Sequence, residues 1–183
     1  MKPTKAAILG LLAFSFQANA QKFWQTSTGK IDFFSKTPVE DIEAHSKTAG
    51  AIINTETGQL AFKVPIKSFK FPNSLMEEHF NENYMESDKF PEGTFSGKME
   101  PLVDFKTPGV YPIKSKGKLK IHGVEVEREM TGTLTIGSDK TATLVSEMEV
   151  PLADHKIERP SLVLVKIAEK IAVKTEFVLK VKE

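Results

Sequence analysis

The chain has 183 residues, with 25 Lys and Arg against 24 Asp and Glu, and it contains no Cys. A formal charge of +1 gives no electrostatic reason to expect nucleic acid or an anionic membrane as a partner. The lack of Cys excludes disulfides, thiolate metal sites and thiol catalysis, so stability must come from burial and sheet pairing.

The N-terminal segment has the pattern of a secretory signal peptide. Lys2 and Lys5 precede an apolar run over residues 6–16, and Ala18-Asn19-Ala20 forms a small-x-small cleavage site. The run is too short for a transmembrane helix, which needs about 20 apolar residues, and no Cys follows it for a lipid anchor. We therefore expect residues 1–20 to be cleaved and residues 21–183 to form a single domain, periplasmic or secreted.

Alternating apolar and polar residues, the period of half-buried β-strands, dominate the chain after residue 21. The expected strands cover residues 22–27, 30–35, 42–54, 60–67, 94–101, 113–121, 124–136, 142–150 and 173–182. A sheet with one dry face must stack on a second layer or close on itself, and eight strands close with room for one small ligand. We expect an all-β fold, a closed antiparallel β-barrel of about eight strands with one or two short helices capping an end.

Two segments interrupt the alternation. Ser74 and Glu77 have the spacing of a capping box, which predicts a short helix through about Tyr84. Arg159-Pro160-Ser161 predicts a second, shorter helix before the last strand, although the β-branched residues that follow also suit a strand.

The charges around His122-Gly123 predict the register of one hairpin. A two-residue loop at this dipeptide places Lys residues opposite Glu residues on the wet face of the two strands. The predicted pairs are Lys120 with Glu125, Lys118 with Glu127 and Lys116 with Glu129. A slip by one residue would turn the dry face to water, so the pattern indicates this register.

Several motifs resemble the YceI-like family. Residues 60–68 resemble its extended strand ending near a Ser, and residues 76–85 resemble its helical segment. Lys89-Phe90-Pro91 with Thr94-Phe95 is similar to its K-Y-P-x-x-T-F motif, and residues 116–124 are similar to its G-x-L-x-I-x-G-V hairpin. The resemblance spans nearly the whole chain after residue 20. It implies an exported, lipocalin-like barrel that binds isoprenoid lipids.

One segment departs from the family pattern. The family often has an Arg-x-x-Phe-Gly-Ile stretch where residues 152–160 read Leu-Ala-Asp-His-Lys-Ile-Glu-Arg-Pro. We therefore transfer no ligand contact from the family to this segment.

No pattern of side chains points to catalysis or to a metal. The four His lie far apart in the chain, and the nearest approach to a metal-binding spacing is Glu78-His79 with Glu82 on the predicted helix, which also suits a solvated helix face. Gly-x-Ser-x-Gly and glycine-rich phosphate loops are absent. We expect a binding protein rather than an enzyme, with no catalytic residue, metal or cofactor.

The apolar residues indicate a lipid ligand. Thirteen Phe and six Met against two Tyr and one Trp give a mostly hydroxyl-free interior that packs as a core or lines a cavity. Together with the resemblance, this predicts a cavity for a long-chain amphiphile, an isoprenoid or isoprenoid quinone. The candidate ligand-binding residues are Phe62, Val64, Leu75, Phe80, Tyr84, Met85, Phe90, Phe95, Leu119, Val126, Arg128, Met130 and Phe177.

The function has two alternatives at this point. A filled, ligand-free barrel would have a structural or stress-protective role, and an enzyme could use the barrel as a reaction chamber. The sequence predicts no transmembrane segment and leaves a homodimer open.

Arg128 stands apart from the other candidates because it falls on the apolar face of its predicted strand. An unpaired inward charge is costly. Arg128 therefore either reaches water at the rim of the barrel or pairs with an inward carboxylate or a ligand headgroup.

Overall fold

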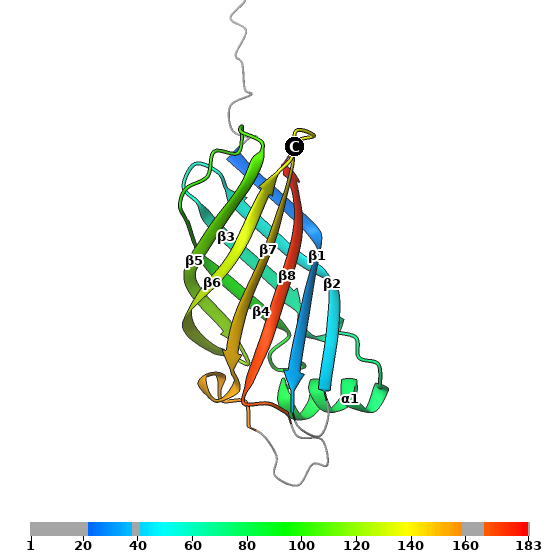
Figure 1. Ribbon diagram of the computed structural model, residues 1–183. Helices are drawn as coiled ribbons and strands as arrows, with labels where there is room; N and C mark the ends of the chain where they lie inside the picture. The colour runs from blue at the N-terminus through cyan, green and yellow to red at the C-terminus, as the bar shows by residue number, and fades with distance from the viewer. Residues whose placement is uncertain (1–21, 38–40, 159–166, 183) are drawn as a thin grey trace, which may run out of the picture.

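The computed structural model describes residues 22–37, 41–158 and 167–182. Within these residues, eight antiparallel strands hydrogen bond in chain order, and β8 pairs with β1 to close a barrel (Figure 1). The strands are β1 Phe23–Lys36, β2 Asp41–Asn54, β3 Gln59–Pro65, β4 Glu92–Glu100, β5 Gly109–Ile121, β6 Val124–Ile136, β7 Thr141–Pro151 and β8 Lys170–Val181. The predicted fold class is confirmed.

The first two predicted strands are one strand in the structure. β1, Phe23–Lys36, is a single element because the break in alternation near Gly29 is a bulge, with register shifts against β2 on both sides of it. A bulge inserts an extra residue without ending the strand, which is why the sequence pattern resembles two strands there.

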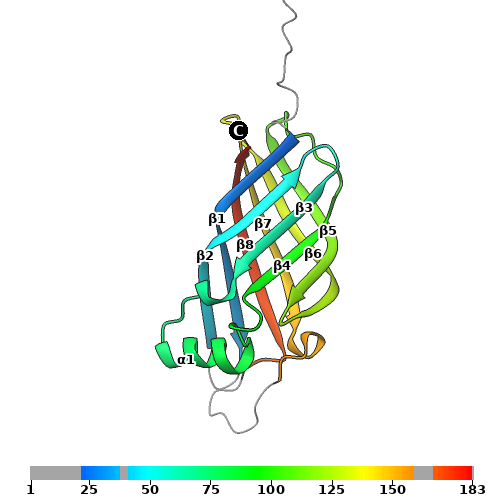
Figure 2. The same cartoon turned by 180° about the vertical axis from the view of Figure 1, so that it is seen from behind.

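A short helical segment covers one end of the barrel (Figures 1 and 2). α1 spans Ser74–His79 and continues as a π-type turn, η3, over Phe80–Tyr84. The N-cap is Asn73, whose Oδ1 accepts a hydrogen bond from the backbone N–H of Leu75 at 2.8 Å, so the helix is capped one residue before the predicted Ser74. Glu77 instead pairs with Lys70 at 2.6 Å and accepts a hydrogen bond from the Phe71 backbone N–H at 3.4 Å, so it binds the chain that precedes the helix.

Two short 3-10 turns complete the described chain. The 3-10 turns η2, Ile66–Ser68, and η4, Leu152–His155, follow β3 and β7. The predicted signal peptide lies outside the described residues, as does nearly all of the second predicted helix.

The β5–β6 hairpin has the predicted register. Lys120 lies opposite Glu125, and Lys118 lies opposite Glu127. The ion pairs form diagonally, however, with Lys118 Nζ 2.8 Å from Glu125 Oε1 and Lys114 Nζ 3.3 Å from Glu129 Oε1. Long side chains reach diagonal neighbours across a twisted pair of strands, so the charge pattern predicts the alignment but not the individual contacts.

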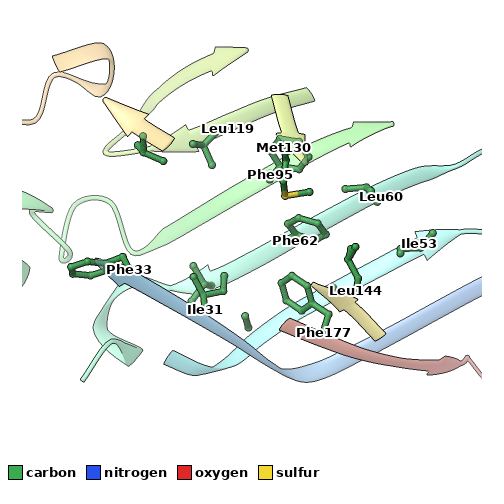
Figure 3. Packing of buried hydrophobic residues seen from close by; sticks show 14 of the residues in the cluster. Ile31, Phe33, Ile53, Leu60, Phe62, Phe95, Leu119, Met130, Leu144 and Phe177 are labelled. Carbon is green, nitrogen blue, oxygen red and sulfur yellow. The ribbon is translucent and has the colours of Figure 1, made fainter. Parts of the chain in front are cut away.

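The barrel interior is densely packed in the half that lies away from α1. Six side chains there are at most 3% exposed, namely Ile53, Leu60, Met99, Leu134, Leu144 and Leu179. In Figure 3, Ile53 and Leu60 lie toward one end of the cluster, Phe33 and Leu119 lie toward the other, and Phe62 and Phe177 lie between them. The interior therefore has a filled half and a half next to the helix.

Candidate ligand cavity

An apolar cavity of about 130 Å³ lies in the half of the barrel next to η3. Strand alternation builds its walls, because every second residue points inward. On β8 the inward residues are Ile171, Val173 and Thr175, and on β7 they are Met148 and Val150.

Aromatic rings gather at the helical end of the cavity. Phe80, the first residue of η3, stacks on Phe33 of β1 with ring centroids 5.3 Å apart. Its ring centroid also lies 5.8 Å from that of Phe69 and 5.0 Å from that of Phe71. Phe80 thus joins the helical segment to the barrel at the cavity, which is where a lid would need its contacts.

A second aromatic group lies at the inner end of the cavity. The ring centroid of Phe62 on β3 is 5.5 Å from that of Phe95 on β4 and 4.7 Å from that of Phe177 on β8. Phe62 and Phe95 line the cavity, while Phe177 is fully buried behind Phe62. We call these three residues the aromatic floor.

Polar groups at the described part of the cavity wall are few. Lys63 turns outward, with its Nζ 3.1 Å from Glu92 Oε1. The Thr175 hydroxyl lies 2.6 Å from that of Ser146, so its hydrogen-bonding capacity is already used inside the protein. Burial raises the pKa of the Tyr84 phenol, which stays neutral over the physiological range. The cavity therefore suits hydrocarbon.

Seven of the thirteen candidate ligand-binding residues are brought together around this cavity. They come from β3, η3, the residue after η3, β4 and β5, which the barrel closes around one space. They are Phe62, Val64, Phe80, Tyr84, Met85, Phe95 and Leu119.

The other six candidates do not line the cavity. Phe177 and Met130 are fully buried, and Met130 accepts a hydrogen bond from Ser146 at its sulfur. Leu75 is 55% exposed on α1, and Phe90 packs edge-on against His122. Val126 of β6 is half-buried opposite Leu119, outside the cavity lining. Arg128, the sixth, belongs to a seam beside the cavity.

This seam is the gap between the first half of β6 and the end of β7. In the described chain β6 pairs with β7 over Thr131–Ile136, and η4 lies across the gap. The Arg128 guanidinium pairs with the Asp154 carboxylate of η4 and donates to the Glu127 carbonyl at 3.0 Å. The Arg128 side chain is 16% exposed, and its partner carboxylate is 47% exposed, so the charge pairs at the rim with a protein carboxylate that does not point into the barrel.

Two histidines connect the seam to the helical segment. Nδ1 of His122, in the β5–β6 turn, donates to the His155 carbonyl at 3.1 Å, and its Nε2 lies 2.7 Å from Glu86 Oε2. The His122 hydrogen bond holds the pKa of the Glu86 carboxyl below its usual range. Glu86 directly follows the lining residue Met85, so this contact fixes the chain where it leaves the cavity wall.

Sequence reasoning missed most of the lining from β1, β7 and β8, namely Ile31, Phe33, Met148, Val150, Ile171, Val173 and Thr175. Alternation identifies all of them as inward, but it does not say which inward residues of each strand lie at the height of the cavity.

Metal sites and membrane-spanning helices are two further features to consider in the described residues. No cluster there combines three or more His, Asp or Glu side chains in positions to hold a metal ion. Across residues 22–37, 41–158 and 167–182, no helix is long and apolar enough to cross a membrane.

The order and closure of the strands can be compared with known families. The model of the YceI-like domain matches residues 13–179. The chain belongs to the YceI-like family. The resemblance found in the sequence is thereby confirmed. No curated protein gives a significant match.

Several solved structures share this fold at low sequence identity. A polyisoprenoid binding domain from Saccharophagus degradans has a TM-score of 0.74 and 14% identity, covering 88% of this chain and 99% of that one. BcnA of Burkholderia cenocepacia has a TM-score of 0.68 and 15% identity, covering 82% and 95%. The YCEI protein of Campylobacter jejuni has a TM-score of 0.55 and 16% identity, covering 100% of both chains. At these identities the likeness concerns the fold alone.

Proposed function

We propose that this YceI-like chain is an exported lipid-binding protein that sequesters or carries the hydrocarbon of an amphiphile, an isoprenoid or isoprenoid quinone. The observation that carries the proposal is the apolar cavity between Phe80, at the helical end, and the aromatic floor. Transfer of hydrocarbon from water into such a space contributes about 0.8 kcal/mol per methylene. The fold shared with a polyisoprenoid binding domain supports the same class of ligand.

The chemistry of the wall favours binding over catalysis. A reaction chamber needs polar groups that converge on one point. Among the described lining residues, Thr175 is engaged with Ser146, and Tyr84 lies in the helical segment at one end. This arrangement offers no pair of groups for acid–base or nucleophilic work, so we infer a binding protein.

The packed half of the barrel favours one alternative, a ligand-free structural barrel. Mass spectrometry of an organic extract of the purified native protein separates the two functions. A lipid present in about equimolar amount supports the proposal. An empty extract, together with no binding of added farnesol or decanol to the delipidated protein, would favour the structural role.

Export is the second part of the proposal and rests on the N-terminal pattern. Fractionation of expressing cells, with the intact mass of the product, tests it. A product that begins at Gln21 and lies outside the cytoplasm is the expected result, and a cytoplasmic product that retains Met1 would contradict it.

A further inference from the structure

The cavity ends at the aromatic floor rather than continuing through the barrel. Phe62, Phe95 and Phe177 are at most 5% exposed, and the Phe62 ring stacks on that of Phe95 and lies tilted against that of Phe177 (Figure 3). Behind them lie Ile53, Leu60 and the other buried side chains of the packed half, which do not line the cavity. Protein interiors at this density do not yield space without moving side chains.

The backbone holds the floor in place from behind. A Cβ at Gly29, in the β1 bulge, would lie 2.2 Å from Cδ1 of Phe177 and 2.5 Å from its Cε1. The Phe177 ring therefore occupies the volume that any side chain at position 29 would need. Its other neighbour is Phe62, so the ring cannot turn away from the cavity without displacing another floor residue.

The strand geometry gives the depth of the cavity. On β8 the cavity wall extends from Ile171 to Thr175, and the next inward residue is Phe177. Four residues of strand span about 13 Å at about 3.3 Å per residue. An extended chain advances about 1.2 Å per bond, as the polypeptide backbone itself does, so this depth accommodates about ten bonds of hydrocarbon.

We propose that the aromatic floor is a chain-length ruler: the ligand enters with its hydrocarbon end first, and carbons beyond about the tenth gain no further burial. This proposal rests on the proposed function and specifies its ligand class. The three floor residues are apolar, and the nearby Thr175 hydroxyl is held by Ser146. A polar headgroup at the floor would lose its water without gaining partners, so it stays at the helical end.

The test measures the affinity of delipidated wild type for octanol, decanol, dodecanol, tetradecanol and hexadecanol by displacement of a fluorescent probe. Affinity is expected to rise about fourfold per methylene up to about decanol or dodecanol, following the transfer energy, and then to stay level. Phe62→Leu and Phe177→Leu should each move this break to longer chains by one member of the series. Two floor variants are used so that one that fails to fold does not end the test.

The matched control is Phe33→Leu, which removes the same kind of ring from the helical end of the cavity. It should weaken all five alcohols alike and leave the break in place. Two results would overturn the ruler while leaving lipid binding intact. One is an affinity that rises through hexadecanol in wild type, and the other is a break at the same chain length in wild type and in both floor variants. A lack of binding by every alcohol would instead overturn the proposed function itself.

Discussion

The His155 imidazole is fixed against the backbone of Val124, with Nδ1 3.1 Å from the carbonyl oxygen. The ring is fully buried in the seam between β6 and β7, and its other nitrogen, Nε2, has no hydrogen-bond partner among the described residues. The neutral tautomer with the proton on Nδ1 fits this site, because a protonated Nε2 would be left unpaired.

This burial predicts that stability decreases in mild acid. Burial lowers the pKa of His155 from 6.5; the Arg128 cation reinforces this shift, and the backbone of Val124, the Asp154 carboxylate and the backbone of Ile121 oppose it. Between the lowered pKa and 6.5 the unfolded chain binds the proton and the folded chain does not. The contribution of neutral His155 to the free energy of unfolding is therefore complete above pH 6.5 and decreases as the pH falls below it. Urea unfolding between pH 7.5 and 5 measures the slope.

His155→Gln keeps an amide donor for Val124 and should remove most of this slope. His79→Gln, on α1, is the control and should retain it. An unchanged slope in His155→Gln would show that the acid sensitivity arises from other groups.

The Arg128–Asp154 pair should be asymmetric in its effect on stability. Asp154→Ala leaves a guanidinium that is 16% exposed without its carboxylate and should cost about 1–3 kcal/mol. Arg128→Met leaves a carboxylate that is 47% exposed and regains water, so it should cost less than about 1 kcal/mol. Urea denaturation compares the two, and the reverse order would mean that the Arg128 stem contributes through packing instead of charge.

Strands β4 and β5 approach closely at Gly97 and Gly117, which are direct partners. A Cβ at Gly117 would lie 2.3 Å from the Ser96 carbonyl oxygen, so Gly117→Ala should destabilise the protein by about 1–3 kcal/mol through overpacking. Gly50→Ala is the control, since its nearest contact would be Thr26 O at 3.7 Å, and it should change stability by less than about 1 kcal/mol. Thermal denaturation measures both, and equal melting midpoints for Gly117→Ala and Gly50→Ala would contradict the close approach of β4 and β5.

Phe80 should control ligand exchange. Phe80→Ala removes ring contacts with Phe33, Phe69 and Phe71, each worth about 0.5–1.5 kcal/mol. If the helical segment opens to release lipid, these losses lower the opening barrier and raise the dissociation rate about tenfold or more. Stopped-flow displacement of a bound fluorescent fatty acid measures the rate.

The control for this prediction is Leu75→Ala, which lies in the same helical segment and is 55% exposed. It should change neither the dissociation rate nor the melting temperature. An unchanged rate with a large drop in melting temperature for Phe80→Ala would place Phe80 in the core of the fold instead of at a gate.

Much of the barrel was predictable because strand alternation is a local property. A residue such as Val173 is inward because its neighbours Lys174 and Ala172 must point to the other face. The opposite charges of Lys118 and Glu127 likewise predict one hairpin register, since a slip would turn apolar residues to water. The resemblance to the YceI-like family rests on motifs of this local kind.

The sequence by itself thus determined which face of each strand is dry and how the β5–β6 hairpin aligns, whereas closure of the sheet is shown by the pairing of β8 with β1. The tertiary structure decided the height of each strand along the barrel, which places Phe62 at the aromatic floor and leaves Met130 outside the cavity lining. It also decided that Arg128 pairs with Asp154, 26 residues away across the seam. Period-two alternation carries no information about height, because strand tilt and stagger are set by closure of the whole sheet.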